Sequence, residues 1–364
     1  MAWLAVSSSQ NNRFKADGSG TEPAPVHPTA DQDALLVQGS LVVEMRLPST
    51  SRPEPMVLFA QDGDWPVKLA LRAVPGGGLN LVLEQSGAVL HRTLNPSETA
   101  RADLLRMTYS WDAPRRWGQL ALERVDSGQV QIMELQSPRP WRLGDLRALL
   151  RPGPFRYVSP DVQFIALSDQ IEPIGPMPSL TAQTPIATPM GYRSLDSLKR
   201  GDLVLTAEGI SVPVLHVVRR TVPTVGSFHP IRLRAPYFDL QQDIDVAPSQ
   251  RLVISGSEVE YLFGQQSVLV PAQHLVATHT AYQPKACVSE TTYMQLILPD
   301  HAAPLAAGAV VESLFIGRLR RDRKRLAASI LAKVNRSELP EHGQPKYPVL
   351  RSFDATVLAE RRVA

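Results

Sequence analysis

Histidine and cysteine are the side chains of this chain best suited to metal binding or nucleophilic chemistry. His274 and His279 lie five residues apart, so both could be metal ligands. A protein metal site normally uses three or four ligands, and no third ligand accompanies this pair. We therefore expect these histidines to pack at the end of a strand, and the sequence predicts neither a metal nor another cofactor.

Cys287 is the single cysteine of the chain. One thiol excludes an internal disulfide bond and any metal site built from several cysteines. We expect Cys287 to be an unreactive, partly buried side chain.

A basic segment near the carboxyl end, residues 318–325, holds six cations in eight residues. Such a segment can attract nucleic acid or an acidic membrane surface by releasing counterions. No aromatic residues interleave with the cations to stack on bases, and the net charge of the whole chain is only +3. We expect this segment to be a solvated surface, and nucleic-acid binding is not predicted.

The elements that must position any site are predicted to be strands. The chain has 32 prolines in 364 residues, and helix interiors tolerate proline badly. No apolar run reaches the ~18 residues of a membrane span, so none is predicted. The apolar stretch from Ala2 to Val6 is also too short for a cleavable secretory signal. The sequence leaves the location open between the cytoplasm and export by a non-classical route.

Short apolar or alternating runs separated by turn residues extend from Gly39 to about Gln136. Alternation is clearest from Lys68 to Arg72 and from Gln119 to Glu123, where every second side chain would face a core. The order of these runs resembles the laminin-G or concanavalin-like jelly roll. We expect a jelly-roll sandwich over 35–160, preceded by a disordered tail over 1–34 and followed by a linker over 161–178 in which Val162 to Leu167 could add one strand.

This resemblance implies an unknown protein or glycan ligand for the first domain. Jelly-roll lectins commonly bind sugars through loop carboxylates and calcium. Asp62, Asp64 and Asp112 have no ligand-dense loop around them, so a spacer or protein-contact role remains the alternative.

The segment from Ser179 resembles the opening of Hint (hedgehog/intein) domains. A nucleophile position is followed there by a short strand and by a segment close to VEDLxPGDLVLT. Later Hint motifs also occur here in the expected order. The matching segments are 184–188 (TPIAT), 195–206 (LDSLKRGDLVLT), 244–252 (IDVAPSQRL), 268–275 (VLVPAQHL), 298–301 (LPDH) and 306–313 (AAGAVVES). The resemblance implies an all-β, horseshoe-like domain over 179–364, with one or two helices at its carboxyl end.

The resemblance also implies a self-cleaving centre, in which a thiolate attacks the preceding carbonyl while a Thr and a His assist the scissile nitrogen. Ser179, Ala247 and Gln250 occupy the three positions in this chain. A hydroxyl is almost wholly protonated at neutral pH and needs a base more than a thiol does. Neither Ala247 nor Gln250 can replace the missing acid-base pair.

His301 occupies the position of the family's late histidine and is the one remaining candidate acid-base group. A histidine hydrogen-bonded in the turn after Asp300 is an equal alternative. We expect no splicing, because the sequence closes with SFDATVLAERRVA and offers no His-Asn end. We expect a non-catalytic binding or structural protein with a degenerate site at Ser179, Gln250 and His301. The alternative is an autoprotease that cleaves between Pro178 and Ser179, with Ser179 as nucleophile.

Overall fold

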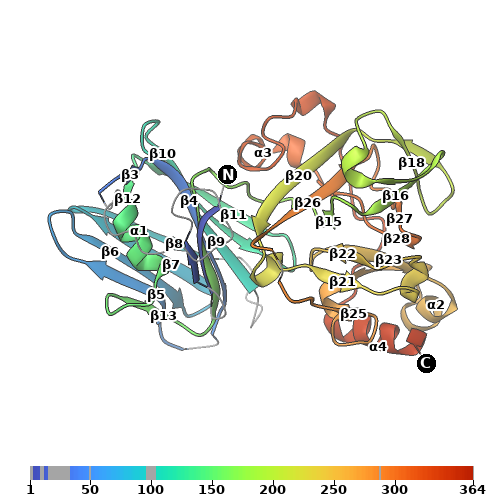
Figure 1. Ribbon diagram of the computed structural model, residues 1–364, viewed down its shortest axis with the longest axis horizontal. Helices are drawn as coiled ribbons and strands as arrows, with labels where there is room; N and C mark the ends of the chain where they lie inside the picture. Colours follow the sequence, from blue (N-terminus) through green and yellow to red (C-terminus); the bar gives the residue numbers. More distant parts are fainter. Residues whose placement is uncertain are drawn as a thin grey trace. The chain divides into compact units, whose positions relative to one another are not determined.

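The computed structural model describes residues 3–8, 12–14, 33–48, 51–95, 104–286 and 288–363, so Cys287 lies outside the described residues. The chain divides into two compact units, residues 1–173 and 174–364. Strands dominate both units, which confirms the predicted all-β class (Figure 1). No helix within the described ranges has the length and apolar character needed to cross a membrane.

The first unit is a sandwich of two antiparallel sheets. Its larger sheet has the order β11-β10-β9-β4-β14-β1-β2, formed by β1 (Trp3–Ser8), β2 (Asn12–Phe14), β4 (Gln38–Arg46), β9 (Leu104–Asp112), β10 (Trp117–Arg124), β11 (Val130–Gln136) and β14 (Val162–Ser168). Its smaller sheet has the order β13-β5-β6-β7-β8, formed by β5 (Glu54–Gln61), β6 (Val67–Val74), β7 (Gly78–Gln85), β8 (Ala88–Leu94) and β13 (Arg156–Val158). A short pair, β3 (Leu35–Leu36) with β12 (Trp141–Arg142), leads into α1 (Leu143–Leu150).

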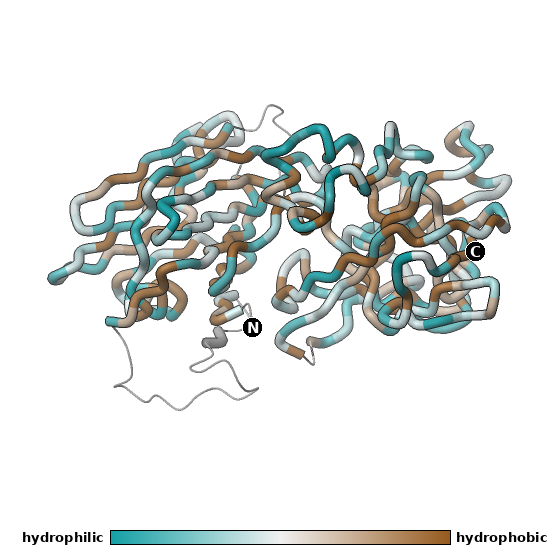
Figure 2. The backbone as a smooth tube through the Cα atoms, turned by 90° about the horizontal axis from the view of Figure 1, so that it is seen from above, coloured by the Kyte–Doolittle hydropathy of each residue, from teal (hydrophilic) through white to brown (hydrophobic). Residues whose placement is uncertain are grey.

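Alternation in sequence becomes alternation in burial along these strands. In β6 the side chains of Val67, Leu69 and Leu71 are buried, whereas Lys68 and Arg72 are exposed. One apolar core collects the inward side chains of both sheets. The hydropathy colouring in Figure 2 changes repeatedly between brown and teal along the backbone, as such strands require.

Tryptophan contributes the largest side chains of this core. Trp111 and Trp141 are fully buried, and Tyr109 stacks on Trp111 with 5.5 Å between ring centroids. The five tryptophans of the chain all precede residue 173, the last being Trp141.

The predicted tail over 1–34 is wrong for its first residues. Residues Trp3–Ser8 form β1, which pairs with β14 on one side and β2 on the other. Trp3 and Ala5 are 2% and 3% exposed. Burial of these side chains favours a strand over a solvated tail. Residues 15–32 of the predicted tail lie outside the described residues.

The strand that Val162 to Leu167 could add within the predicted linker over 161–178 is confirmed as β14 (Val162–Ser168), which lies inside the larger sheet. Both neighbours of β14 are paired strands, and Phe164 through Leu167 are buried. The two units meet at Pro173 and Ile174, near the proline-dense end of the predicted linker. Helix α1, whose Leu146 and Leu149 enter the core, was not predicted.

The second unit is built from small sheets around its own core. Its main sheet has the order β20-β26-β15-β22-β21-β25, from β15 (Leu180–Thr181), β20 (His216–Pro223), β21 (Ile231–Leu233), β22 (Ile244–Val246), β25 (Ala281–Tyr282) and β26 (Glu290–Ile297). A second sheet has the order β17-β16-β27-β28, from β16 (Pro185–Thr188), β17 (Gly191–Ser194), β27 (Leu305–Ala306) and β28 (Ala309–Val310). Two hairpins complete the strands, β18 (Leu203–Leu205) with β19 (Ser211–Pro213) and β23 (Arg251–Ser255) with β24 (Ser267–Pro271).

Helices of the second unit are short. Besides α2 (Ser257–Phe263), two lie toward the carboxyl end, α3 (Arg323–Ala328) and α4 (Ser352–Val363), in agreement with the sequence. Helix α4 packs on the core of this unit through Ala355, Leu358 and Ala359. Single-turn 3-10 helices span Leu195–Ser197, Gly226–Phe228, Tyr237–Asp239, Ala272–Leu275, Leu319–Arg321 and Arg336–Glu338.

Candidate functional site

Ser179 directly precedes β15, one of the central strands of the main sheet of the second unit. The next residue, Leu180, pairs with Val246 of β22 and with Met294 of β26, so β15 is held on both edges. The carbonyl of Ser179 accepts a hydrogen bond from the backbone N–H of Ala247, at 2.7 Å. The residue is 6% exposed. The backbone around Ser179 is therefore fixed by sheet pairing.

Gln250 is the side chain that contacts the Ser179 hydroxyl. Ser179 Oγ donates to Gln250 Oε1 at 2.7 Å, and Gln250 is 1% exposed. The backbone N–H of Gln250 in turn donates to the carbonyl of Ala247, which closes a turn after β22. Ser179, Ala247 and Gln250 therefore form one centre, although 71 positions separate Ser179 and Gln250 in sequence.

The carboxamide of Gln250 is fully occupied by hydrogen bonds. Its Nε2 donates to the carbonyls of Arg251, at 2.7 Å, and Glu312, at 3.3 Å. Its Oε1 accepts from Gln295 Nε2, at 3.1 Å, as well as from Ser179. Gln295 also donates to the Glu312 carbonyl, at 2.7 Å. These contacts set the orientation of the amide, with the oxygen toward Ser179.

Gln295 was not identified from the sequence. It lies on β26, in the fully buried stretch from Tyr293 to Ile297, and is 2% exposed. A polar amide within a buried apolar run must find hydrogen-bond partners. A glutamine within an apolar run of the sequence was therefore the signal that could have identified Gln295.

His301 lies apart from Ser179, and within the described residues no hydrogen bond joins the two. His301 Nδ1 accepts from the backbone N–H of Lys346, at 3.4 Å. His301 Nε2 lies 3.1 Å from Glu312 Oε1, a distance typical of an ion pair, although the angle is poor for a hydrogen bond. Glu312 also pairs with Arg251, at 3.2 Å. The imidazole of His301, the one candidate acid-base group, thus lies against the Glu312 carboxylate.

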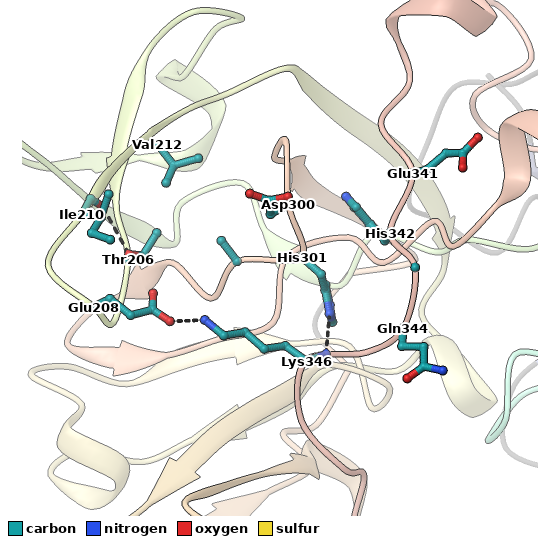
Figure 3. Close-up of a pocket in the computed structure, with 12 residues that line it drawn as sticks. Thr206, Glu208, Ile210, Val212, Asp300, His301, Glu341, His342, Gln344 and Lys346 are labelled. Atoms are coloured by element: carbon teal, nitrogen blue, oxygen red, sulfur yellow. Dashed lines mark hydrogen bonds and ion pairs between the residues drawn. The ribbon is translucent and has the colours of Figure 1, made fainter.

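His301 lines a cavity of about 590 Å³ (Figure 3). The rest of its wall comes from the β18–β19 hairpin, from the turn around Asp300 and from residues 341–346. Lys346 crosses the cavity in Figure 3 and pairs with Glu208. Its hydrogen bond to Glu208 raises the pKa of Lys346, and the same contact lowers the pKa of Glu208. No group of three or more possible metal ligands occurs in the part of the chain that the structure describes.

His342 is the second histidine of this cavity and is held as a neutral ring. Its Nδ1 accepts from the backbone N–H of Ile316, at 3.3 Å, so its Nε2 is the nitrogen that donates to the carbonyl of Leu298, at 3.1 Å. Burial lowers the pKa of His342 below the ordinary value for histidine. A protonated ring would lose the bond to Ile316, since both nitrogens would then be donors.

The family model described as "Hint domain" matches residues 178–318. The second unit carries a Hint domain. The match begins one residue before Ser179, so the Ser179 centre and His301 both lie inside the Hint domain. The family resemblance seen in the sequence is confirmed, and this part of the chain has the fold of self-processing domains.

Three solved structures illustrate what the chain is similar to. The MchDnaB-1 intein has 16% identity and a TM-score of 0.24, covering 37% of this chain and 98% of its own. The Ruminococcus gnavus IT-sialidase CBM40 bound to alpha2,3 sialyllactose has 16% identity and a TM-score of 0.21, covering 36% of this chain and 62% of its own. Sheep galectin-11 in complex with glycerol has 12% identity and a TM-score of 0.22, covering 40% and 91%. No curated protein matches the chain.

Proposed function

We propose that the Hint domain of this chain does not cleave itself and that the chain acts as a two-domain binding or structural protein. The hydrogen bond from Ser179 Oγ to Gln250 Oε1, at 2.7 Å, carries this proposal. A side-chain amide as the partner of the Ser179 hydroxyl, in place of an acid-base group, supports the absence of self-cleavage.

Cleavage at this site would require an N-to-O shift. A bond would form from Ser179 Oγ to the carbonyl carbon of Pro178 while the bond from that carbon to the Ser179 nitrogen breaks. The hydroxyl proton would have to leave and the nitrogen would have to gain one. A carboxamide accepts a hydrogen bond but neither takes nor supplies a proton at neutral pH. General acid-base assistance is worth about 10² to 10⁴ in rate, and Gln250 cannot give it.

The other two positions do not replace this function. Ala247 has no hydroxyl and contributes its backbone N–H to the Ser179 carbonyl. His301 is engaged with the Glu312 carboxylate and the Lys346 backbone. The alternative function, autoproteolysis with Ser179 as nucleophile, would need a base that these contacts do not supply.

A denaturing gel tests the proposal on the full chain after expression and prolonged incubation. We expect one band at full length for the wild type, for Ser179→Ala and for a matched surface variant, Ser211→Ala. Pieces of about half the chain length in the wild type and in Ser211→Ala, lost in Ser179→Ala, would establish the autoprotease instead.

A further inference from the structure

The smaller sheet of the first unit carries a hollow of about 620 Å³ on its outward face. Strands β5, β6 and β7, which lie side by side (Figure 1), form its floor, and residues 154–157 form one side. On that side Phe155 is 63% exposed and Tyr157 is 45% exposed. Exposed aromatic rings of this kind are typical of a surface that another protein chain covers. The hollow belongs entirely to the first unit and is independent of the Ser179 centre.

Charged side chains of both signs border the hollow. Lys68 and Glu84 pair in register on β6 and β7, so their side chains lie next to each other on one face of the sheet. Arg72 lies further along β6, and Asp62 lies in the loop between β5 and β6. Among the described residues, the outward face thus offers two cations and two carboxylates at the hollow. A strongly anionic or strongly cationic partner would meet like charge there.

Arg156 also lines the hollow but is directed into the sandwich. Its register partner on β5 is Phe59, which is buried in the core. The guanidinium donates to Ser7 Oγ at 3.0 Å, and Ser7 is 3% exposed. The positive charge of Arg156 therefore lies on the inner side of the sheet and does not unbalance the outward face.

Rows of paired residues cross β6 and β7 on the outward face. In chain order along β6, the rows are Lys68 with Glu84, Ala70 with Val82, and Arg72 with Asn80. A two-fold axis that runs parallel to the strands, between β6 and β7, exchanges the two strands. A second copy of the sheet placed by this axis therefore meets each row with the same row in reverse order.

The reversed rows are complementary to the original ones. Lys68 of one protomer lies opposite Glu84 of its partner, and the same pairing recurs on the other side of the axis. Arg72 lies opposite Asn80, whose side-chain nitrogen is hydrogen-bonded to two side chains of β8. The side-chain oxygen of Asn80 is therefore the atom that can accept from the guanidinium.

The middle row keeps the two faces close. Ala70 lies opposite Val82, so the centre of the contact is apolar and low. Face-to-face sheets pack about 10 Å apart when the side chains between them are of this kind.

We propose that two copies of this chain associate through the outward face of the smaller sheet, about a two-fold axis between β6 and β7. Phe155 and Tyr157 stand beside the paired rows on the β13 side, and the symmetry places a set of these rings on both sides of the contact. Rings at such positions exclude water from the charged pairs. Self-association goes beyond the binding or structural role proposed above and does not depend on the Ser179 centre.

Sedimentation equilibrium of the full chain over a range of concentrations tests the dimer. We expect the wild type to reach the mass of two chains as the concentration rises. Lys68→Glu sets a carboxylate opposite Glu84 at two symmetric places, so the dissociation constant of the dimer should rise at least about tenfold. Tyr157→Ser removes a ring and should weaken the dimer by a similar factor. The matched control is Lys333→Glu, at an exposed lysine of the second unit, which should associate like the wild type.

The double variant Lys68→Glu with Glu84→Lys separates a specific pairing from a general loss of folding. It exchanges the two charges, so opposite charges again face each other across the axis, and the dissociation constant should return close to the wild-type value. A wild type that stays monomeric at every concentration would overturn the dimer. A dimer that Lys68→Glu leaves unchanged, or a double variant as weak as Lys68→Glu alone, would overturn the proposed contact.

Discussion

Gln295 stands behind Gln250 and donates its side-chain N–H to the same oxygen that accepts from Ser179, at 3.1 Å. The Gln250 oxygen is therefore shared between a donor on β26 and the hydroxyl before β15. Because both amides also bond to the Glu312 carbonyl, the network reaches from Ser179 to the residue whose carboxylate faces His301. The centre is thus a connected hydrogen-bond network, and its removal should be measurable as lost stability.

Gln250→Ala should destabilise the second unit by about 3 kcal/mol, because it leaves several buried polar groups without a partner and each such group costs about 1 to 3 kcal/mol. Scanning calorimetry of the full chain would measure the change. Gln265→Ala, at an exposed position, should stay within about 0.5 kcal/mol of the wild type. Equal stability of Gln250→Ala and wild type would contradict a structural role for the network.

Restoring the missing groups should restore self-cleavage. The triple variant Ser179→Cys, Ala247→Thr and Gln250→His supplies a thiolate, a hydroxyl and an imidazole at positions that already touch. We expect thiol-induced cleavage to two pieces of about half the chain length on a denaturing gel. Ser179→Cys alone should stay intact, and cleavage in that single variant would mean that the absent base is not the limiting defect.

The stability of the second unit should fall in mild acid because of His342. Its folded-state pKa is lowered by burial, whereas the unfolded value is about 6.5. Below that pH the unfolded chain binds a proton that the folded chain resists, so the free energy of unfolding declines as the pH falls through about 6.5. Melting temperatures at about pH 7.5 and about pH 5.5 should differ less in His342→Gln than in the wild type. His279→Gln, at an exposed position, should retain the wild-type difference.

Trp3→Ala should destabilise the first unit by about 3 to 5 kcal/mol, as expected when a large buried aromatic side chain is removed. Urea unfolding followed by fluorescence of the remaining tryptophans would measure it. Val89→Ala, where the side chain is 64% exposed, provides the control and should unfold like the wild type. Unchanged unfolding of Trp3→Ala would contradict the pairing of β1 with β14.

The sheets of the first unit were predictable where burial alternates along a strand, as from Lys68 to Arg72 in β6. Strand β1 was not, because its partner β14 lies far along the chain and no local pattern links Trp3 to Ser168. Helix α1 was missed for a similar reason, because the burial of Leu146 and Leu149 results from tertiary packing. Whether a short apolar run near a terminus or a proline-rich stretch forms a strand or a helix therefore depends on the segments that it packs against.

The centre of the Hint domain was predictable in position but not in detail. The motifs placed Ser179, Ala247 and Gln250 at corresponding positions, and the structure brings these residues into contact. The roles of Gln295 and Glu312 depend on how β26 and the chain after β28 fold beside Gln250. Whether Ser179, Gln250 or His301 takes part in catalysis stays a prediction for the cleavage assays.

The placement of every tryptophan before residue 173 gives the two units different optical properties. Tryptophan emission therefore comes from the sandwich alone, because the Hint domain has no tryptophan. A change in emission during titration with a denaturant can therefore be assigned to the first unit without any label. Calorimetry of the same sample also detects the unfolding of the Hint domain, which tryptophan emission does not report.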